Sequence, residues 1–571
     1  MKNQLVAGIL YTIADLLDVK GDLFFKTRAY RIAAQTIEAM EEDIEHVVKQ
    51  ARLQSIPGIG EALAQKITEI VNTGKLEYLE RLKKEVPEGV IDLLRIPGLG
   101  PKKVAALYKN LGISTIQDLS IAASQGKLRQ LDGFGEITER NILRGIQLRE
   151  KTSGRVLLNV AYEDSVDILA YLKKCKNIEK INIAGSLRRM KETIGDLDIL
   201  ASSKKPEAVM EYFVKYPHVS QVLAKGSTKS SVVLNDNLQV DLRVVEAKSY
   251  GAALQYFTGS KEHNVTLRSL AIKKGYKLNE YGLFDKSSEQ FIAGKTEEEI
   301  YKKIGLPYIE PELRENHGEF EAAAKKKLPS LIGYDEINGD FHVHSLWSDG
   351  SDSLEAIANA AQQKGYEFIG ITDHSQSLKI ANGLSEDRIR KKLEGIKKLS
   401  KKFPTLRILC GTECDIKSDG TLDYSNKILK QFDFVYIAIH TAFKMDKDTM
   451  TKRIIKGMEN EQVDFLAHPT GRLIGKRDPY EVDIEQIIDA AKETNTMLEI
   501  NSFPDRLDLD DAHAKLAKEH GVKCVLGTDS HSINHLPFIR FGIATARRGW
   551  LEKKDILNTY SLQQIKKIIG G

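Results

Sequence analysis

The sequence predicts a multidomain protein in which all-α domains come first, an α+β region follows, and a distorted (β/α)7 barrel forms the C-terminal part. Three observations predict this fold class. The 571 residues are too many for a single hydrophobic core. A helical pattern that begins with two glycines occurs three times before residue 143, and seven strand-like runs alternate with helical patterns after residue 338. Alternating strands and helices are typical of a parallel barrel.

The composition is that of a globular chain, with 42% hydrophobic and 29% charged residues. The net charge of +4 is small, so nucleic-acid binding has to be argued from motifs. No apolar run reaches the roughly 18 residues that a membrane span needs, and we expect a cytoplasmic protein without a membrane partner. The four cysteines lack CxxC spacing, which predicts reduced thiols. Cys410 and Cys414 are either a metal pair or small buried residues beside a strand end.

Three segments of the N-terminal third share the order apolar-x-Gly-apolar-Gly followed by a helical pattern. They are SIPGIGEALAQKI (55–67), RIPGLGPKKVAAL (95–107) and QLDGFGEITERNI (130–142). The glycines permit a tight turn, and the amides at the start of the next helix then face outward, where they can hold a phosphate. One copy is compatible with a plain helix connection. Three copies predict helix-hairpin-helix domains that contact a nucleic-acid backbone without reading its sequence.

The middle of the chain carries three strand carboxylates. Asp196 and Asp198 lie two apart in GDLDIL, so they face the same side of a strand, and Asp241 lies in the apolar run VDLRVV. Three converging carboxylates suit two Mg²⁺ or Mn²⁺ ions that share their ligands with substrate phosphates. The turn at Gly185 and Ser186 supplies donors for a triphosphate, with Arg188 or Arg189 adding positive charge.

From about residue 20 to 315 the chain resembles the family X DNA polymerases, on GDLDIL, VDLRVV and YFTGSKEHNVTLRSLAIKKGYKLNEYGLF in that order. The resemblance implies that Asp196 and Asp198 hold both metal ions and that Asp241 binds the catalytic one. It implies that Ser186 and Arg189 contact the triphosphate. It also implies that six residues lie at the sugar and the nascent base pair: Tyr256, Phe257, Thr258, Gly259, Asn264 and Arg268. Alternatively, Arg268 holds the template strand. Lys261 departs from the Asp common in the family.

The same resemblance implies a 5′-deoxyribose phosphate lyase in the first hairpin domain. Lys66 occupies the position of the Schiff-base lysine, while Lys26 and Tyr30 match residues of the 5′-phosphate pocket. Ala62 replaces another lysine of the pattern. A lysine nucleophile needs a lowered pKa, for which burial or a nearby cation is the usual cause. The alternative is that Lys66 is an ordinary surface lysine.

The strand-like runs after residue 338 end in residues that bind metals. A single histidine at the end of a strand is most often a core residue. In a parallel barrel, however, the carboxyl ends of all strands meet at one mouth, so side chains from seven strands converge there. This region resembles the PHP domain, and the resemblance implies three metal ions, Zn²⁺, Mn²⁺ or Fe²⁺. The implied ligands are His342, His344, Asp349, His374, Glu413, His440, His468, Asp529 and His531. By loop position, Arg506, Lys476 or Arg477 is a candidate to bind substrate.

These patterns predict six segments: a lyase-like helical domain (1–85), a second helical DNA-binding domain (86–152), a palm (153–247), a nucleotide-selection thumb (248–318), a linker (319–337) and a PHP domain (338–571). The combination resembles bacterial and archaeal family X enzymes. It implies a monomeric, nucleoid-associated polymerase that fills gaps in DNA repair using deoxynucleoside triphosphates and gapped or nicked DNA. The barrel then acts as a 3′–5′ exonuclease. Alternatively it is a phosphomonoesterase or pyrophosphatase, or a metal-stabilised structural module.

Overall fold

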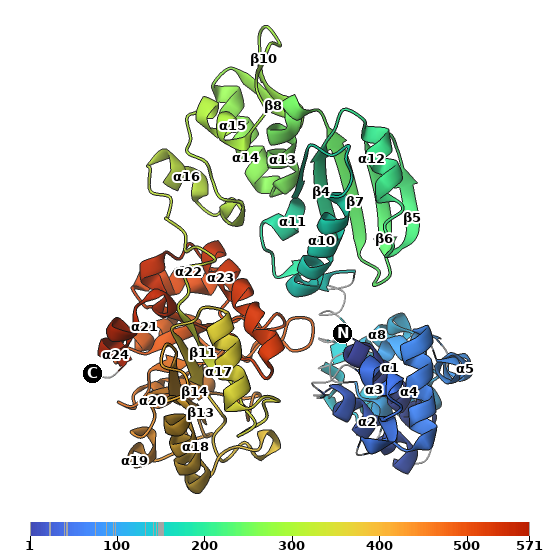
Figure 1. Cartoon of the computed structure of the whole chain (residues 1–571), viewed down its shortest axis with the longest axis vertical. Helices are drawn as coiled ribbons and strands as arrows, with labels where there is room; N and C mark the ends of the chain where they lie inside the picture. The colour runs from blue at the N-terminus through green and yellow to red at the C-terminus, as the bar shows by residue number, and fades with distance from the viewer. Residues whose placement is uncertain are drawn as a thin grey trace. The chain divides into compact units, whose positions relative to one another are not determined.

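The computed structural model describes residues 2–569 apart from 22–23, 39, 41–43, 57, 75, 87, 95, 97–98, 132, 137, 141, 144–145 and 147–153. The chain divides into two compact units. The first comprises residues 1–153 with 475–477, and the second comprises residues 154–474 and 478–571. Figure 1 shows both units.

The first unit is helical in the part that the structure describes. Its α-helices are α1 (Lys2–Lys20), α2 (Phe24–Glu38), α3 (Ile44–Lys49), α4 (Glu61–Thr73), α5 (Glu77–Glu85), α6 (Glu88–Leu93), α7 (Pro101–Leu111) and α8 (Ile116–Ser124). Two of the repeated hairpins lead into α4 and α7, which are preceded by Gly60 and Gly100. Gly58 and Gly133 have φ of 87° and 79°, values that favour glycine. Pro97, Gly98 and Asp132 of the repeats lie outside the described residues.

The second unit begins with a five-stranded sheet in the order β2-β4-β7-β6-β5. Its strands are β2 (Lys180–Ile183), β4 (Asp196–Ser202), β5 (Val219–Lys225), β6 (Lys229–Leu234) and β7 (Gln239–Val245). A short antiparallel pair joins β1 (Val156–Leu157) to β3 (Thr193–Ile194). Helices α10 (Leu158–Leu172) and α12 (Pro206–Phe213) pack their apolar faces into the same core as β4 and β7. The neighbouring strands β4 and β7 are parallel, which matters for the carboxylates they carry.

A smaller α+β segment follows along the chain. It contains α13 (Tyr250–Thr258), α14 (Lys261–Lys273), the antiparallel strands β8 (Tyr276–Asn279), β9 (Gly282–Asp285) and β10 (Phe291–Ala293), and then α15 (Glu297–Ile304) and α16 (Glu319–Ala324). Its core includes Leu267, Leu283 and Tyr301. In Figure 1 this segment lies directly beside the five-stranded sheet that contains β4 and β7.

The C-terminal part is a seven-stranded parallel sheet that curls into a barrel, with strand order equal to chain order. The strands are β11 (Gly339–Val343), β12 (Phe368–Ile371), β13 (Arg407–Asp415), β14 (Phe434–Ala438), β15 (Phe465–Leu466), β16 (Met497–Asn501) and β17 (Cys524–Gly527). Its helices are α17 (Leu354–Gln363), α18 (Glu386–Leu399), α19 (Asn426–Leu429), α20 (Lys447–Met458), α21 (Ile484–Thr494), α22 (Asp511–His520), α23 (Ile539–Arg548) and α24 (Leu562–Ile569).

The ring of strands is nearly closed. Val343 at the end of β11 forms a parallel bridge with Ser530, which follows β17, and the His344 amide donates to the Ser530 carbonyl at 2.8 Å. Aromatic rings fill the barrel interior, where the Phe341 ring lies 4.6 Å from that of Phe368 and 5.4 Å from that of Phe465. The predicted fold class is therefore confirmed, with helices first, α+β elements next and a seven-stranded barrel last.

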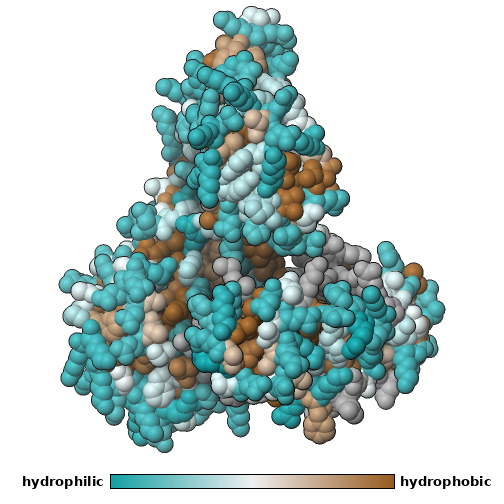
Figure 2. Space-filling view, turned by 45° about the vertical axis from the view of Figure 1, so that its right-hand side comes forward, coloured by the Kyte–Doolittle hydropathy of each residue, from teal (hydrophilic) through white to brown (hydrophobic). Residues whose placement is uncertain are grey.

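The structure also bears on two further expectations, one about the cysteines and one about membrane-spanning helices. All four cysteines are free and buried, and within the described residues no cysteine belongs to a group of side chains able to hold a metal ion. No helix among the described residues is long and apolar enough to cross a membrane. Figure 2 shows that hydrophilic side chains dominate the face in view, with apolar ones in small scattered groups.

Candidate active sites

The three predicted palm carboxylates come together because β4 and β7 are adjacent and parallel. Asp198 lies directly opposite Asp241 in the strand register. Asp196 lies two residues before Asp198 and therefore faces the same side of β4. Gly185 packs against this pair, since a Cβ there would lie 2.2 Å from the Asp198 Oδ2. A glycine is required at 185 if the turn is to approach the carboxylates this closely.

The electrostatics of the trio fit a divalent cation. Burial, followed by repulsion from Asp196 and Asp241, raises the pKa of Asp198 to about 7. Burial also acts to raise the pKa of Asp241, but Lys229, whose Nζ lies 2.7 Å from Asp241 Oδ2, and Gln239 hold it below its ordinary value. Carboxylates that repel one another in a partly buried site form the oxygen-rich set that Mg²⁺ or Mn²⁺ prefers.

An open cavity of about 410 Å³ lies over these carboxylates. Most residues predicted to bind the nucleotide or the metal ions line it: Gly185, Ser186, Arg189, Asp196, Asp198, Tyr256, Phe257, Gly259, Asn264 and Arg268. Two further cations, Arg155 and Lys261, join the lining. Asp241 and Thr258 do not line the cavity. Thr258 is fully buried and accepts a hydrogen bond from Arg188 at 2.6 Å.

The structure distinguishes the two arginines of the Gly-Ser turn. Arg188 makes a bidentate pair with Glu297, at 3.0 and 2.5 Å, and so joins the sheet to the following α+β segment. Arg189 lines the cavity, and its Nε donates to Glu315 at 3.0 Å. Glu315 also accepts from Arg548 of helix α23 at 3.0 Å. Of these two arginines, Arg189 is therefore the one that lines the cavity.

The residues predicted for the lyase meet around one tyrosine that the sequence reasoning missed. The Nζ atoms of Lys66 and Lys26 lie 5.2 and 5.8 Å from the centre of the Tyr78 ring. The Tyr30 ring stacks on the same ring at 6.3 Å, and the Arg81 guanidinium lies 5.2 Å from it. Three cations therefore gather on one aromatic surface although Ala62 replaces a lysine of the family pattern.

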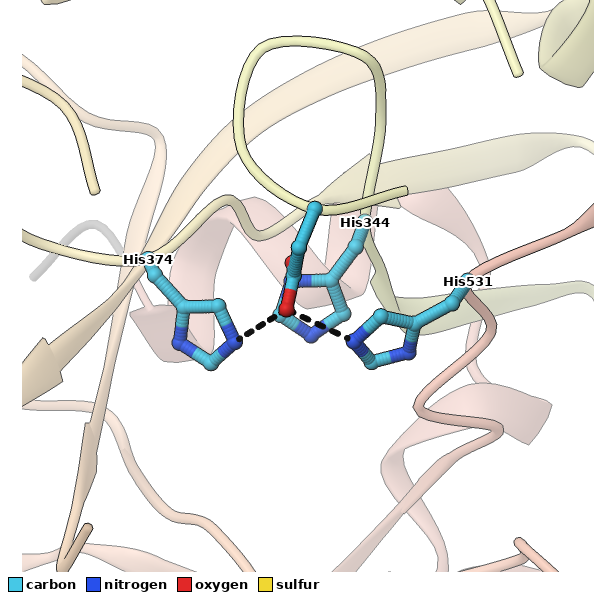
Figure 3. A group of neighbouring side chains, drawn as sticks. His344, His374 and His531 are labelled. Carbon is cyan, nitrogen blue, oxygen red and sulfur yellow. Dashed lines mark ion pairs between the residues drawn. The ribbon is translucent and has the colours of Figure 1, made fainter. Parts of the chain in front are cut away.

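In the barrel, eight of the nine predicted ligands fall into three groups able to hold a metal ion. The groups are His344, Asp349, His374 and His531; His342, His344 and Asp529; and His374, Glu413 and His440. The remaining residue, His468, lies with its Nε2 2.8 Å from Glu413 Oε1. Figure 3 shows the first group, in which His374 and His531 point toward the same carboxylate, that of Asp349, at 3.6 and 3.3 Å.

Unsatisfied atoms support metal binding by this cluster. The buried atoms His344 Nδ1, His374 Nδ1 and Glu413 Oε2 make no hydrogen bond of good geometry in the described structure, although His374 Nδ1 and Glu413 Oε2 lie 3.0 Å apart. Such atoms are costly to bury unless another ligand satisfies them. Burial acts to raise the pKa of Glu413, but the surrounding imidazoles, His440 and His374 first, hold it well below its ordinary range. An imidazole and carboxylate set of this kind suits Zn²⁺, Mn²⁺ or Fe²⁺.

A second layer of carboxylates orients these side chains, and the sequence reasoning did not find it. Glu499 Oε1 lies 2.7 Å from His342 Nδ1, and Asp415 Oδ1 lies 2.7 Å from His440 Nδ1. Carboxylates commonly fix the ring orientation of metal-binding histidines in this way. A separation of two residues from Glu413 along β13 was the available signal for Asp415.

Among the contacts that the structure describes, those of Arg506 place this proposed substrate-binding cation at the barrel cluster. Its Nε lies 3.2 Å from Asp529 Oδ2. The carboxylates of Asp529 and Glu413 raise its pKa against the opposing effect of burial. Lys476 and Arg477 group with the first compact unit.

Four family models match separate parts of the chain. A helix-hairpin-helix domain matches residues 1–76, and a SAM-like helix-hairpin-helix tandem matches residues 90–148. The DNA polymerase beta thumb matches residues 253–315, and the PHP domain matches residues 340–503. The matched ranges follow the order of the helical, α+β and barrel parts.

Three relatives differ in how much of the chain they cover. The DNA polymerase/3′-5′ exonuclease PolX of Bacillus subtilis (strain 168) is 40% identical over 571 residues, which is 100% of this chain and 99% of that protein. The DNA polymerase lambda of Rattus norvegicus is 26% identical over 55% of this chain and 56% of its own length. A probable phosphatase of Thermoanaerobacter sp. (strain X514) is 30% identical over 41% of this chain and 97% of its own length.

Proposed function

Because the chain belongs to the PolX family of DNA polymerase/3′-5′ exonucleases, we propose that it fills short gaps in DNA during repair and degrades DNA 3′ ends in its barrel. The observation that carries the proposal is the presence of two separate groups of candidate metal ligands in one chain. Asp196, Asp198 and Asp241 repel one another on adjacent strands, and the barrel holds histidine and carboxylate groups able to bind a metal ion.

In the polymerase site, two Mg²⁺ or Mn²⁺ ions would supply charge for the nucleotidyl transfer when bound by Asp196, Asp198 and Asp241. Arg189 and Ser186 bind the triphosphate at the mouth of the turn. Asp241 favours removal of the proton from the primer 3′-hydroxyl. Tyr256 and Phe257 form the wall against which the sugar lies, and an additional 2′-hydroxyl would collide with that wall.

Beyond the wall, Asn264 and Arg268 face the base pair that is being formed. The Asn264 side chain is fixed from two sides, because its Oδ1 accepts from Gln255 and its Nδ2 donates to the Tyr256 carbonyl, both at 2.7 Å. A fixed side chain costs little further entropy when it meets a correctly paired nucleotide.

In the barrel, up to three bound ions, Zn²⁺, Mn²⁺ or Fe²⁺, would supply a hydroxide at neutral pH and charge for the leaving oxygen. The residues of the chain position them: Glu413 lies at the centre, with His374, His440 and His468 around it. Arg506 adds a cation beside Asp529, where a phosphodiester of the DNA strand would carry its negative charge.

A second candidate for the barrel is a phosphomonoesterase or pyrophosphatase that acts on small products. The similarity of this part to a probable phosphatase over nearly the whole of that relative favours it. A third candidate is a metal-stabilised structural module without turnover, and the buried histidine cluster is compatible with it.

We also propose that the first unit binds the 5′ side of a gap and that Lys66 acts there as the Schiff-base lysine of a 5′-deoxyribose phosphate lyase. The supporting observation is the set of three cations around Tyr78. Lys26 and Arg81 supply the positive charge that holds the 5′-phosphate beside Lys66.

The predicted six-segment division, with boundaries at 85, 152, 247, 318 and 337, is part of this proposal, as are gapped or nicked DNA and deoxynucleoside triphosphates as substrates. We further propose that the protein acts as a monomer in the cytoplasm, associated with the nucleoid.

One assay separates the candidates. A primer labelled at its 5′ end is annealed to a gapped template and incubated with Mg²⁺ or Mn²⁺, with and without deoxynucleoside triphosphates. The proposed enzyme lengthens the primer when triphosphates are present and shortens it one nucleotide at a time when they are absent. A phosphomonoesterase changes only the terminal charge of a 3′-phosphorylated primer, and a structural module leaves the 3′ end intact. A primer that is never extended contradicts the polymerase assignment.

A further inference from the structure

We propose that Leu346 and Ile380 form an apolar rim at the mouth of the barrel cluster, and that this rim receives the unstacked nucleobase at a DNA 3′ terminus. The inference rests on the proposed 3′-end degradation. It adds that the barrel recognises a base beside the phosphate, which a site for small phosphate esters has no need to do.

The entrance to the cluster is marked by the exposure of its members. The side chains of Asp349 and His531 are 31% and 34% exposed. The His440 side chain is 14% exposed, and the other predicted ligands are more deeply buried. A substrate therefore reaches the cluster past Asp349 and His531. Leu346 lies three residues before Asp349, on the loop that follows β11.

A second loop, between β12 and α18, lies against the first. Asn382 Nδ2 donates to the Ser348 carbonyl at 3.0 Å, and Arg388 Nη1 donates to the Asn382 carbonyl at 2.8 Å. Toward its other end, Ser377 Oγ donates to Asp415 Oδ2 at 3.0 Å, next to His440. The second loop therefore spans the carboxyl end of the barrel from the β11 loop to the end of β13, and it carries Ile380.

The two apolar side chains are unusual for this domain. Among the described residues of the barrel, the exposed large hydrophobic side chains are Leu346 at 59%, Ile380 at 96% and Ile568 at 38%. Isolated exposed hydrophobic residues are common on protein surfaces. Here, however, two of the three lie on hydrogen-bonded loops at the entrance to one cluster of predicted metal ligands.

The loop that carries Ile380 is held in place by packing. Ala381 is buried, and a Cβ at Gly383 would lie 1.8 Å from the Ser375 carbonyl oxygen. The chain on the C-terminal side of Ile380 thus packs closely against the segment that follows His374. Because the loop is packed in this way, the Ile380 side chain stays exposed to water, which is unfavourable for an apolar group. A ligand that covers this side chain would therefore bind with a favourable hydrophobic contribution.

The chemistry of a DNA end matches this arrangement. Leu and Ile side chains that insert between bases unstack them in many DNA complexes, and extruded bases commonly pack between apolar side chains. A nucleotide whose phosphate lies at the cluster carries its base on the same sugar, on the side from which the substrate enters. The adjacent Lys379 is exposed and offers a charge for a neighbouring phosphate.

The test uses the full-length protein with Leu346→Ser, Ile380→Ser and the double variant. Val166→Ser, which changes an apolar side chain of helix α10 that is 49% exposed, is the matched control. Degradation of a 5′-labelled single-stranded oligonucleotide and hydrolysis of p-nitrophenyl phosphate are measured together with bound metal. We expect the double variant to lose about tenfold in kcat/KM on the oligonucleotide, an effect of the size of one base contact. Bound metal and p-nitrophenyl phosphate hydrolysis should match those of the control.

A second readout does not depend on catalysis. An oligonucleotide with 2-aminopurine at its 3′ terminus becomes more fluorescent when that base is unstacked. The unchanged protein should produce this increase, and the double variant should not. If the unchanged protein fails to degrade DNA but still gives the increase, the exonuclease proposal fails while the rim stands. An equal increase with the double variant, or a parallel loss on both substrates, overturns the rim.

Discussion

Replacing Lys392 by Met should destabilise the barrel and abolish 3′-end degradation although Lys392 is not a predicted ligand. Lys392 is buried, and its Nζ lies 2.9 Å from Asp373 Oδ2. It also donates to the carbonyls of Ile371 and Gly411 at 3.0 and 3.2 Å. The donor contacts of this ammonium that the structure describes therefore join the carboxyl end of β12 to the middle of β13.

The size of the expected loss of stability follows from Asp373, whose charge stays buried when Lys392 is removed. Asp373 is fully buried and, besides the lysine, accepts from the Ser345 amide at 2.8 Å and from Ser348 Oγ at 2.7 Å. Removing one member of a buried ion pair costs about 3–5 kcal/mol, because the other charge stays buried without compensation. The same Asp373 holds the loop between His344 and Asp349, so its relaxation would move both predicted ligands.

The assay uses the fact that both tryptophans of the chain, Trp347 and Trp550, lie in the barrel region. Tryptophan emission during urea unfolding therefore reports on this region even though the chain has several domains. Bound metal and primer degradation are measured on the same preparations. We expect a loss of stability of about 3–5 kcal/mol, less bound metal and no 3′-end degradation, while primer extension persists.

The double variant Lys392→Met, Asp373→Asn is the control. It removes the uncompensated charge but keeps an acceptor for Ser345, so it should recover part of the lost stability and show a coupling energy above about 1 kcal/mol. A single Lys392→Met protein with the same urea midpoint and the same degradation rate as the unchanged protein would refute the reasoning.

Four further outcomes are expected. Asp198→Asn should lower nucleotide addition at least 100-fold, an effect of about 3 kcal/mol, in a primer-extension assay that leaves 3′-end degradation unchanged. Glu413→Gln should lower bound metal, measured by elemental analysis, because this carboxylate lies at the centre of three histidines. Lys66→Arg should keep the charge near Tyr78 but prevent borohydride trapping of an adduct with 5′-deoxyribose phosphate DNA. Burial raises the pKa of Asp464 to about 7, so the folded barrel binds this proton more tightly than the unfolded chain, and the resulting stability is lost as pH rises toward 7. Asp464→Asn should remove up to about 3 kcal/mol of the stability difference between pH 5 and 8, measured by tryptophan emission.

Each of these expectations has a contrary result. Extension by Asp198→Asn at the unchanged rate would remove that residue from catalysis, and full metal content in a folded Glu413→Gln would remove that one from the centre. Equal trapping by Lys66→Arg would assign the adduct to another amine. An Asp464→Asn protein with an unaltered pH dependence would mean that Asp464 is already ionised in the folded barrel at pH 5.

The order of the domains could be predicted from the sequence because the patterns behind it are local. The repeated Gly-x-Gly turns, the spacing of Asp196 and Asp198, and the strand-like runs that end in histidine or carboxylate each occupy a few consecutive residues. Local periodicity and turn chemistry are what a sequence states directly. The predicted ligands of the barrel were named by resemblance, and the structure brings them within ion-pair distance of one another.

The features that the sequence could not predict depend on which distant segments of the chain come into contact. The turn pattern alone left Arg188 and Arg189 equivalent and the family resemblance favoured Arg189, while the structure adds that Arg188 is paired with Glu297. Tyr78 could not be predicted from the sequence because its partners Lys26 and Tyr30 lie about 50 residues earlier, and Arg81 belongs to the group only through Tyr78.

By itself, the sequence determined the class of each domain and the chemical types gathered at each site, because strand alternation and the shared end of parallel strands fix which side chains face the same way. The tertiary structure decided the supporting shell. Glu499, Asp415 and Lys392 act through contacts with residues from other strands, over separations of up to 157 positions for Glu499 and His342. Such contacts depend on three-dimensional packing and on the balance between burial and pairing of charge. Neither of these produces a periodic pattern in the sequence.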